Sequence, residues 1–194
     1  LTMKRSGANR WLVLASRNVG KLKDFRLLFA PLKFELVSVT EFTGEDVEES
    51  GATFIENALL KARHAAAVSG LPALADDSGL VVDYLGGEPG IFSARYAGEP
   101  GSDERNNQKL LEKLSGVKTA DRTAHFHCSL ALLASAEDPA PLIAEGRWFG
   151  RIAEQLAGGG GFGYDPLFLP KGLTGSAAEL SSAQKNSQSH RGQA

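Results

Sequence analysis

The adjacent carboxylates Asp76 and Asp77, followed by the hydroxyl of Ser78, are the side chains of this sequence with the clearest capacity for chemistry. They stand between two short apolar runs, residues 71–75 and 80–82, which predict two strands with the acidic pair in the turn that joins them. Two ionised carboxylates side by side repel each other, and they are commonly found where they share a divalent cation or a proton. The alternative is an Asx-turn, in which one carboxylate caps local backbone amides. The segment alone leaves both interpretations open.

A second polar group, Asn18, Gly20 and Lys21, lies at the predicted start of a helix that follows an apolar strand directly. A helix N-terminus presents unpaired backbone amides and the positive end of the dipole, so a donor, a glycine and a cation at this point favour phosphate binding. The segment is not a Walker A loop, because Ala15 stands where the first glycine would be and Leu22 where the magnesium-binding hydroxyl would be. An ordinary turn with a solvated lysine is the competing interpretation.

The glycine-rich segment 158–163 matches the pattern G-x-G-x-x-G literally. A dinucleotide-binding fold requires a strand before this pattern and a helix after it, and Pro166 would end any early helix, so that fold is not expected. We expect a mobile glycine loop that presents Phe162, Tyr164 and Asp165, because an aromatic ring stacks on a nucleobase and a carboxylate accepts from its ring N–H groups. The competing interpretation is a glycine turn with a core phenylalanine.

Histidines and cations near the C-terminal end form the remaining polar groups. Lys185, Ser189, His190 and Arg191 occupy a polar stretch that is either a solvated tail or a clamp for an anion and a base. His125 and His127 alternate along one face of a predicted strand beside Cys128, but no second ligand pair has the spacing of a zinc finger. We therefore expect packed strand histidines with partly satisfied imidazoles.

Alternating strands and helices must position these groups. Apolar patterns predict strands at 11–15, 34–39, 71–75, 80–82, 123–134, around 142–143 and at 150–152, and helices at 20–29, 53–70 and 102–116. Helices interleaved with strands favour an α/β fold around a mostly parallel or mixed sheet. The sequence contains no internal repeat.

Composition restricts the class of protein. A chain of 194 residues with 42% hydrophobic and 23% charged residues is expected to form one domain. Its net charge of −2 provides no overall basic field for nucleic acid or an anionic membrane, so neither is an expected partner. The single cysteine fits a reducing compartment, and the N-terminal ten residues lack the apolar core of a signal peptide. We expect a cytoplasmic protein with a disordered lead at residues 1–10 and its domain at 11–194.

Five segments, taken together, carry a resemblance to a known family. They are residues 15–21, 48–62, 75–98, 160–168 and 184–192, with the sequences ASRNVGK, EESGATFIENALLKA, ADDSGLVVDYLGGEPGIFSARYAG, GGFGYDPLF and QKNSQSHRG. In this order and spacing they resemble the inosine triphosphate pyrophosphatase family. The resemblance implies a two-lobed α/β fold around a long mixed sheet with flanking helices, a nucleotide cleft between the lobes, and a homodimer. It also implies metal-dependent cleavage of ITP, dITP and XTP to the nucleoside monophosphate and pyrophosphate, usually with Mg²⁺ and with Mn²⁺ as the alternative ion.

Site residues are carried over from the resemblance by position. It implies phosphate binding by Ser16, Asn18 and Lys21, metal binding by Glu48 and Asp77, proton transfer to Asp77, and substrate contact by Ser78. It implies that the base and sugar are bound by Phe162, Gly163, Tyr164, Asp165, Lys185, His190 and Arg191. Glu49 is an alternative metal ligand, and Lys61, with Asn57 one helical turn before it, is an alternative phosphate contact.

Two departures from the family pattern bear on these assignments. Ser16 stands where the family frequently has threonine, which keeps the hydroxyl, and the sequence stops at Ala194, where such proteins usually begin a last helix. The competing function is a non-catalytic nucleotide-binding regulatory module. The acidic residues argue against it, because a pure binding site gains nothing from negative charge near phosphates unless a metal is present.

Overall fold

The computed structural model describes residues 10–32 and 34–194, and the predicted disordered lead at residues 1–10 therefore lies outside the described residues except for Arg10, which begins the first strand. The chain divides into two compact units. The first contains the described residues up to Gly51, Ile55–Asp76 and Leu130–Ile143; the second contains Ala52–Phe54, Asp77–Ser129 and Ala144–Ala194. The expectation of a single domain over 11–194, with a cleft between lobes, stays a prediction.

Six strands form one mixed sheet in the order β2-β1-β3-β4-β5-β6. The strands are β1 (Arg10–Leu14), β2 (Phe34–Ser38), β3 (Ala73–Val82), β4 (Thr123–Leu133), β5 (Leu142–Ile152) and β6 (Phe168–Pro170). β1 runs parallel to both β2 and β3, whereas β5 and β6 are antiparallel, so the predicted mixed α/β class is confirmed.

In residues 10–32 and 34–194, five α-helices accompany the strands. They are α1 (Val19–Phe29), α2 (Phe54–Ser69), α3 (Asp103–Lys113), α4 (Ser182–Gln188) and α5 (His190–Gln193). The first three were predicted within one or two residues at their starts, since each has a clear apolar periodicity. Within the described part of the chain, no helix has the length and apolar character that crossing a bilayer requires.

Two strand predictions were wrong in the same way. The segments 71–75 and 80–82 belong to one continuous strand, β3, so Asp76 and Asp77 lie in mid-strand and not in a turn. Likewise the segments around 142–143 and at 150–152 are the two ends of β5. In both cases a polar stretch interrupts the apolar pattern, but pairing with neighbouring strands continues through it and keeps the backbone extended.

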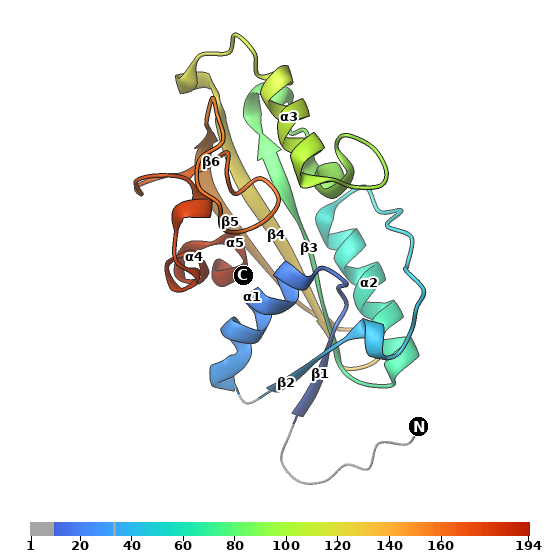
Figure 1. The fold of residues 1–194 in the computed structure, drawn as a ribbon. Helices are drawn as coiled ribbons and strands as arrows, with labels where there is room; N and C mark the ends of the chain where they lie inside the picture. Colours follow the sequence, from blue (N-terminus) through green and yellow to red (C-terminus); the bar gives the residue numbers. More distant parts are fainter. Residues whose placement is uncertain (1–9, 33) are drawn as a thin grey trace. The chain divides into compact units, whose positions relative to one another are not determined.

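The first unit is built around small side chains. On α2, Ala58, Ala62 and Ala65 are fully buried at helical spacing, and they pack with Val13 of β1 and Ala73 of β3. Alanine allows a helix to approach a sheet closely, because its side chain adds only one methyl group. Figure 1 shows α1 and α2 on opposite sides of these strands, and the loops that precede these two helices carry the predicted phosphate residues and Glu48.

Larger side chains fill the core of the second unit. Leu110 of α3 and Leu114, the residue that ends this helix, are fully buried in one cluster with Leu80 of β3 and with Phe126 and Trp148 of β4 and β5. Because side chains of a strand alternate between faces, the intervening residues of β4 and β5 point away from this core. The second unit therefore has one apolar face beneath α3 and one polar, partly aromatic face.

Gly79 allows a second segment of the chain to lie directly against β3. A Cβ atom at this position would be 2.3 Å from the carbonyl oxygen of Gly90 and 2.5 Å from Oγ of Ser93. The Ser93 hydroxyl accepts from the backbone N–H of Leu80 at 2.9 Å and donates to the Gly90 carbonyl at 2.6 Å. The glycine is thus required by close packing, because its own φ is not positive.

We predict that Gly79→Ala lowers the free energy of unfolding by about 1–3 kcal/mol, the usual cost of overpacking. The matched control is Gly159→Ala, because a Cβ there has no atom within 4 Å and the φ of Gly159 is not positive. The control is expected to change the free energy by less than about 0.5 kcal/mol. Urea unfolding of both variants measures the difference, and equal stabilities would show that the 90–93 segment moves freely away from β3.

Candidate active site

The predicted phosphate-binding residues lie together at the junction of β1 and α1, in the first unit. Asn18 is the N-cap of α1, and its side-chain oxygen accepts from the backbone N–H of Lys21 at 3.0 Å. The hydroxyl of Ser16 accepts from the backbone N–H of Asn18 at 3.2 Å. These bonds organise the turn so that the start of an eleven-residue helix carries a hydroxyl, an amide and a cation. Such a helix start favours an anion.

Lys21 is paired with Asp76, a partner that the sequence did not indicate. Its Nζ lies 3.2 Å from Oδ2 of Asp76 and 3.5 Å from the Asp76 carbonyl oxygen. Asp76 is 1% exposed. A buried carboxylate beside a lysine holds its side chain in place and compensates its charge. The interpretation of Lys21 as a solvated first-turn lysine is therefore wrong.

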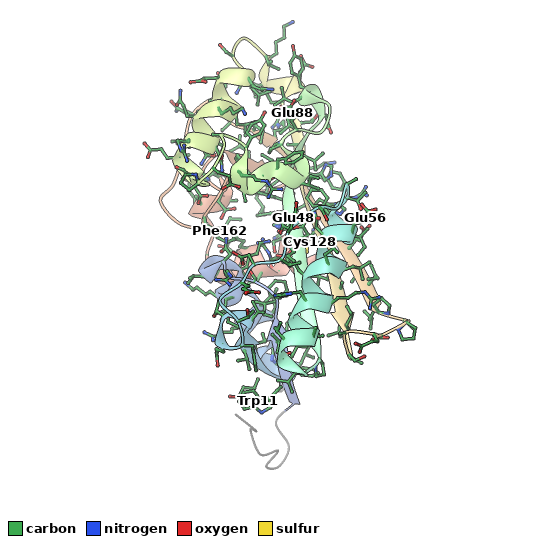
Figure 2. All side chains as sticks on the ribbon, turned by 90° about the vertical axis from the view of Figure 1, so that its right-hand side faces the viewer. Trp11, Glu48, Glu56, Glu88, Cys128 and Phe162 are labelled. Carbon is green, nitrogen blue, oxygen red and sulfur yellow. The ribbon has the colours of Figure 1, made fainter. Side chains whose placement is uncertain are left out.

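The acidic loop before α2 is fastened to that helix by two contacts within the first unit. Lys61 Nζ lies 2.8 Å from Oε1 of Glu49, and Asn57 Oδ1 accepts from the Gly51 N–H at 2.8 Å. Both residues named as alternatives, Glu49 and Lys61, thus serve to hold the loop. Glu48, labelled in Figure 2, is exposed on the same loop and remains the candidate metal ligand there.

Asp77 and Ser78 follow one another along β3 in the second unit, and their side chains point to opposite faces of the strand. Burial lowers the pKa of the His127 imidazole, and the charge of the buried Asp77 carboxylate opposes that shift only in small part. Ser78 Oγ accepts from Nη2 of Arg191 at 2.8 Å. The same alternation separates Asp77 from Asp76, so the two carboxylates do not share one ion through side-by-side side chains.

The predicted base-binding residues form a compact cluster in the second unit. Asp165 is 3% exposed, and its Oδ2 lies 2.5 Å from Nζ of Lys185 and accepts from the backbone N–H of Phe162 at 2.9 Å. The Phe162 ring lies below two cations, with Lys185 Nζ 4.8 Å and Arg191 Cζ 5.4 Å from its centroid. Cations favour the negative face of an aromatic ring. One carboxylate and one ring thus organise both cations.

The C-terminal polar stretch is buried, which bears on the first of its two interpretations, a solvated tail. Lys185, Ser189, His190 and Arg191 are between 3% and 7% exposed. Ser189 caps α5 by accepting from a backbone N–H, and the imidazole of His190 stacks on Phe126 with centroids 4.9 Å apart. A solvated tail is excluded.

Gly163 and Tyr164 contribute mainly through the backbone and by packing. Gly163 has φ +62°, a conformation that favours glycine. Tyr164 is 4% exposed, and this burial raises its pKa. Its hydroxyl donates to the Ser93 carbonyl at 2.9 Å. A buried phenol in this position anchors the loop to the segment that lies against Gly79.

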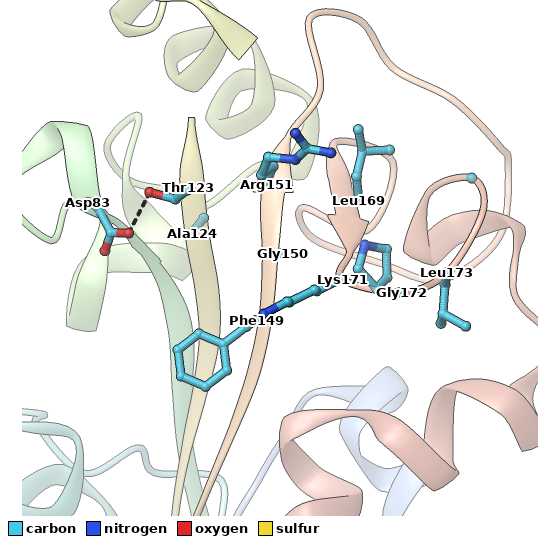
Figure 3. A pocket seen from close by; sticks show the side chains of 12 residues that line it. Asp83, Thr123, Ala124, Phe149, Gly150, Arg151, Leu169, Lys171, Gly172 and Leu173 are labelled. Carbon is cyan, nitrogen blue, oxygen red and sulfur yellow. Dashed lines mark hydrogen bonds between the residues drawn. The ribbon is translucent and has the colours of Figure 1, made fainter. Parts of the chain in front are cut away.

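A cavity of about 670 Å³ lies elsewhere in the second unit (Figure 3). Its lining includes Phe149 and Arg151 of β5, Lys171 after β6, and Asp83, whose carboxylate accepts from the Thr123 hydroxyl at 2.6 Å. No residue predicted to bind phosphate, metal or base lines it. We place the chemistry at the clusters described above, because a cavity's volume says nothing about the groups that a reaction needs.

His125 and His127 lie on the face of β4 that points away from the core. His127 Nε2 lies 3.0 Å from Oγ of Ser129 and 3.5 Å from Oε1 of Glu145, and its ring stacks on Phe54 at 4.8 Å. These contacts confirm packed strand histidines. Across the described ranges, no group of three or more His, Cys, Asp or Glu side chains is arranged to hold a metal.

Comparison with known proteins identifies the family of this chain. The Ham1 family matches residues 12–194. The dITP/XTP pyrophosphatases of Photorhabdus laumondii and of Escherichia coli O157:H7 are each 54% identical to this chain over 183 residues, which cover 94% of it and 93% of each relative. The chain therefore belongs to the Ham1 family, and the resemblance found in its five sequence segments is confirmed.

Solved structures agree with the sequence comparison. A HAM1 protein from Coxiella burnetii superposes with a TM-score of 0.86 at 49% identity, covering 95% of this chain and 93% of that one. The Ham1 protein of Staphylococcus aureus has a TM-score of 0.82 at 43% identity, covering 95% and 94%. The α/β fold is thus that of its family.

The strand histidines generate a pH prediction. Burial lowers the pKa of both His125 and His127, and Arg147 acts in the same direction; for His127 these effects outweigh the opposing charge of Glu145. The folded protein therefore binds protons less readily than the unfolded chain. The free energy of unfolding is expected to be highest above about pH 6.5, the pKa of histidine in the unfolded chain. It is expected to fall as the pH drops from there through the lower pKa of these histidines in the folded protein.

Urea unfolding at about pH 7.5 and pH 5.5, on either side of the ordinary histidine pKa, measures this loss. The double variant His125→Gln/His127→Gln is expected to lose less stability between the two pH values than the wild-type protein. Identical losses of stability in both proteins would show that His125 and His127 do not cause the pH dependence.

Proposed function

We propose that this chain hydrolyses the non-canonical purine triphosphates ITP, dITP and XTP to the nucleoside monophosphate and pyrophosphate. The observation that carries the proposal is 54% identity to dITP/XTP pyrophosphatases over nearly the whole chain. The buried cluster around Asp165 supports it, because charged groups are costly to bury and are retained chiefly for a task. Release of pyrophosphate from dITP tests the proposal directly.

The triphosphate is assigned to the residues at the start of α1. Lys21 is a cation held by a buried partner, and the first amides of α1 provide further donors. Ser16 and Asn18 hold the turn in shape and present a hydroxyl and an amide. Their task is to compensate the negative charge of the phosphates while the reaction proceeds.

A divalent cation is assigned to Glu48 and Asp77. Magnesium binds oxygen ligands, keeps several waters and commonly takes only one or two carboxylates together with substrate phosphates. The carboxylates of Glu48 and Asp77 would each supply oxygen ligands of this kind. Mn²⁺ accepts the same oxygen ligands and is the alternative. When bound, the ion would compensate the charge of the leaving pyrophosphate.

Asp77 is assigned the role of accepting the proton of the attacking water. A water oxygen attacks the α-phosphorus, the bond from that phosphorus to the oxygen that bridges the α- and β-phosphates breaks, and pyrophosphate leaves with the bond's electron pair. The water proton passes to the Asp77 carboxylate. Burial of Asp77 excludes bulk water from the carboxylate and keeps it available for this role.

The base is assigned to the cluster around Phe162. Hypoxanthine and xanthine carry a 6-oxo acceptor, and His190, Arg191 and Lys185 are donors held by burial and by their contacts with Phe126, Ser78 and Asp165. Adenine presents a 6-amino donor to the same groups and would leave them unpaired. Guanine shares the oxo group, so its exclusion requires crowding or an unmatched donor at the 2-amino position.

The homodimer that the resemblance implies stays a prediction, as does the cytoplasmic location expected from the single cysteine and the N-terminal sequence. Sedimentation velocity of the purified chain measures the first.

We predict that Asp77→Asn lowers kcat by at least ~10²-fold, because the amide keeps the shape of the side chain but cannot accept the proton. Glu48→Gln is expected to raise the magnesium concentration needed for half-maximal rate. Glu45→Gln, a change of an exposed carboxylate in the same loop, is the control and should change neither quantity. Near-normal kcat for Asp77→Asn with unchanged magnesium dependence would remove Asp77 from the mechanism.

Base selectivity is the second prediction for this function. We expect kcat/KM for ITP, dITP and XTP to exceed that for ATP and GTP by at least ~100-fold, or about 2.7 kcal/mol, because a mismatched base strands buried donors. Steady-state pyrophosphate release on all five substrates measures the ratio. Similar values for ITP and GTP would contradict the assignment, and tight nucleotide binding without any pyrophosphate release would favour the regulatory module.

A further inference from the structure

Two side chains of α3 hold the peptide groups on both sides of Gly163. The backbone N–H of Gly163 donates to Oδ2 of Asp103 at 2.7 Å, and its carbonyl oxygen accepts from Nδ2 of Asn107 at 2.9 Å. Asp103 and Asn107 are four residues apart, so they lie on the same side of the helix one turn from each other. Ser102 caps the helix and fixes where this turn begins.

The two bonds restrain the backbone rotations at Gly163. The N–H belongs to the peptide group that joins Phe162 to Gly163, and the carbonyl belongs to the next one. Holding both peptide groups restrains φ and ψ of a residue that has no side chain and a φ of +62°. The orientation of the neighbouring Phe162 ring relative to α3 is thereby fixed.

Asn107 shows that this arrangement has a cost in stability. The residue is 5% exposed, and its Oδ1 has no hydrogen-bond partner among the described residues. A buried acceptor without a partner costs about 1–3 kcal/mol. A leucine of similar size would avoid that cost beside the apolar core, so the contribution of Asn107 is its bond to the loop and not the stability of α3.

We propose that Asp103 and Asn107 are positioning residues for base recognition. They do not touch the nucleotide; they hold the loop so that Phe162 meets the base in one orientation. This inference rests on the proposed function, since it assigns a cause to the selectivity of that reaction. Its consequence is that selectivity among purines depends on α3, a helix that contributes no side chain to the predicted base-binding set.

Three variants separate positioning from folding. Asp103→Ala removes the acceptor, whereas Asp103→Asn keeps an oxygen that accepts from Gly163. Asn107→Leu removes the donor together with the unpartnered oxygen. We expect Asp103→Ala and Asn107→Leu to raise KM for dITP by ~5-fold or more and to lower the dITP-to-ATP ratio of kcat/KM by a similar factor, with kcat within ~2-fold of wild type. Asp103→Asn is expected to restore both quantities.

Two control variants of α3 complete the design. Gln108→Ala removes an exposed side chain that donates to Glu112 at 2.9 Å, and it should leave KM and selectivity unchanged. Leu110→Val destabilises the core but removes neither of the two hydrogen bonds to Gly163. If Leu110→Val changes selectivity as much as Asp103→Ala does, the effect is loss of stability and the proposal fails. Asn107→Leu should show a melting temperature no lower than that of wild type.

Amide hydrogen exchange of the peptide covering 158–168 tests the clamp without any turnover. Exchange is expected to be faster in Asp103→Ala and Asn107→Leu, and unchanged in Asp103→Asn and Gln108→Ala. If the wild-type protein releases no pyrophosphate, the proposed function fails, while exchange still reports on the clamp. Unaltered exchange in both disrupting variants, or faster exchange with unaltered KM and selectivity, would overturn the positioning role.

Discussion

The alternation of side chains along β3 is the constraint on which the candidate site depends. A strand sends successive residues to opposite faces, so Asp76 and Asp77 serve different partners although they are neighbours in sequence. Asp76 is committed to Lys21, and Asp77 lies where it acts on His127. If the segment were the turn that its sequence suggests, both carboxylates would be solvated. Asp76 would then lose its buried pairing with Lys21, and Asp77 would lose its buried position.

In the second unit, the predicted base-binding cluster depends on the buried ion pair between Lys185 and Asp165. Removing one partner of such a pair typically costs 3–5 kcal/mol, because a charge is left without compensation in a low-dielectric environment. Lys185 and Asp165 therefore require each other, and Asp165 also binds the backbone of Phe162. Well-packed apolar residues would give comparable stability. The pair is better explained by recognition, since it sets a cation above the ring that is assigned to the base.

Close backbone packing connects β3 with the loop that carries Phe162 and Asp165 within the second unit. Gly79 lets the 90–93 segment lie on β3, Ser93 binds that strand through its hydroxyl, and its carbonyl accepts from Tyr164. From there the chain continues through Gly163, which α3 holds on both sides. The loop that carries Phe162 is thus held by hydrogen bonds from its neighbours, Gly163 and Tyr164, to α3 and to the 90–93 segment. Attachment of this kind supplies the geometric accuracy that discrimination between similar bases requires.

The sequence by itself determined the family, the α/β class, the helices α1 to α3 and the identity of the charged groups, because apolar periodicity and short motifs are local properties. It did not determine that β3 and β5 are continuous, since strand pairing overrides a local polar interruption. It left Lys185 and His190 divided between a solvated tail and a clamp, and only tertiary packing buried them. Asp103 and Asn107 gave no signal at all, because in sequence they are two polar residues in the first half of a polar helix. Their partner, Gly163, lies about sixty residues away and meets them only in the folded chain.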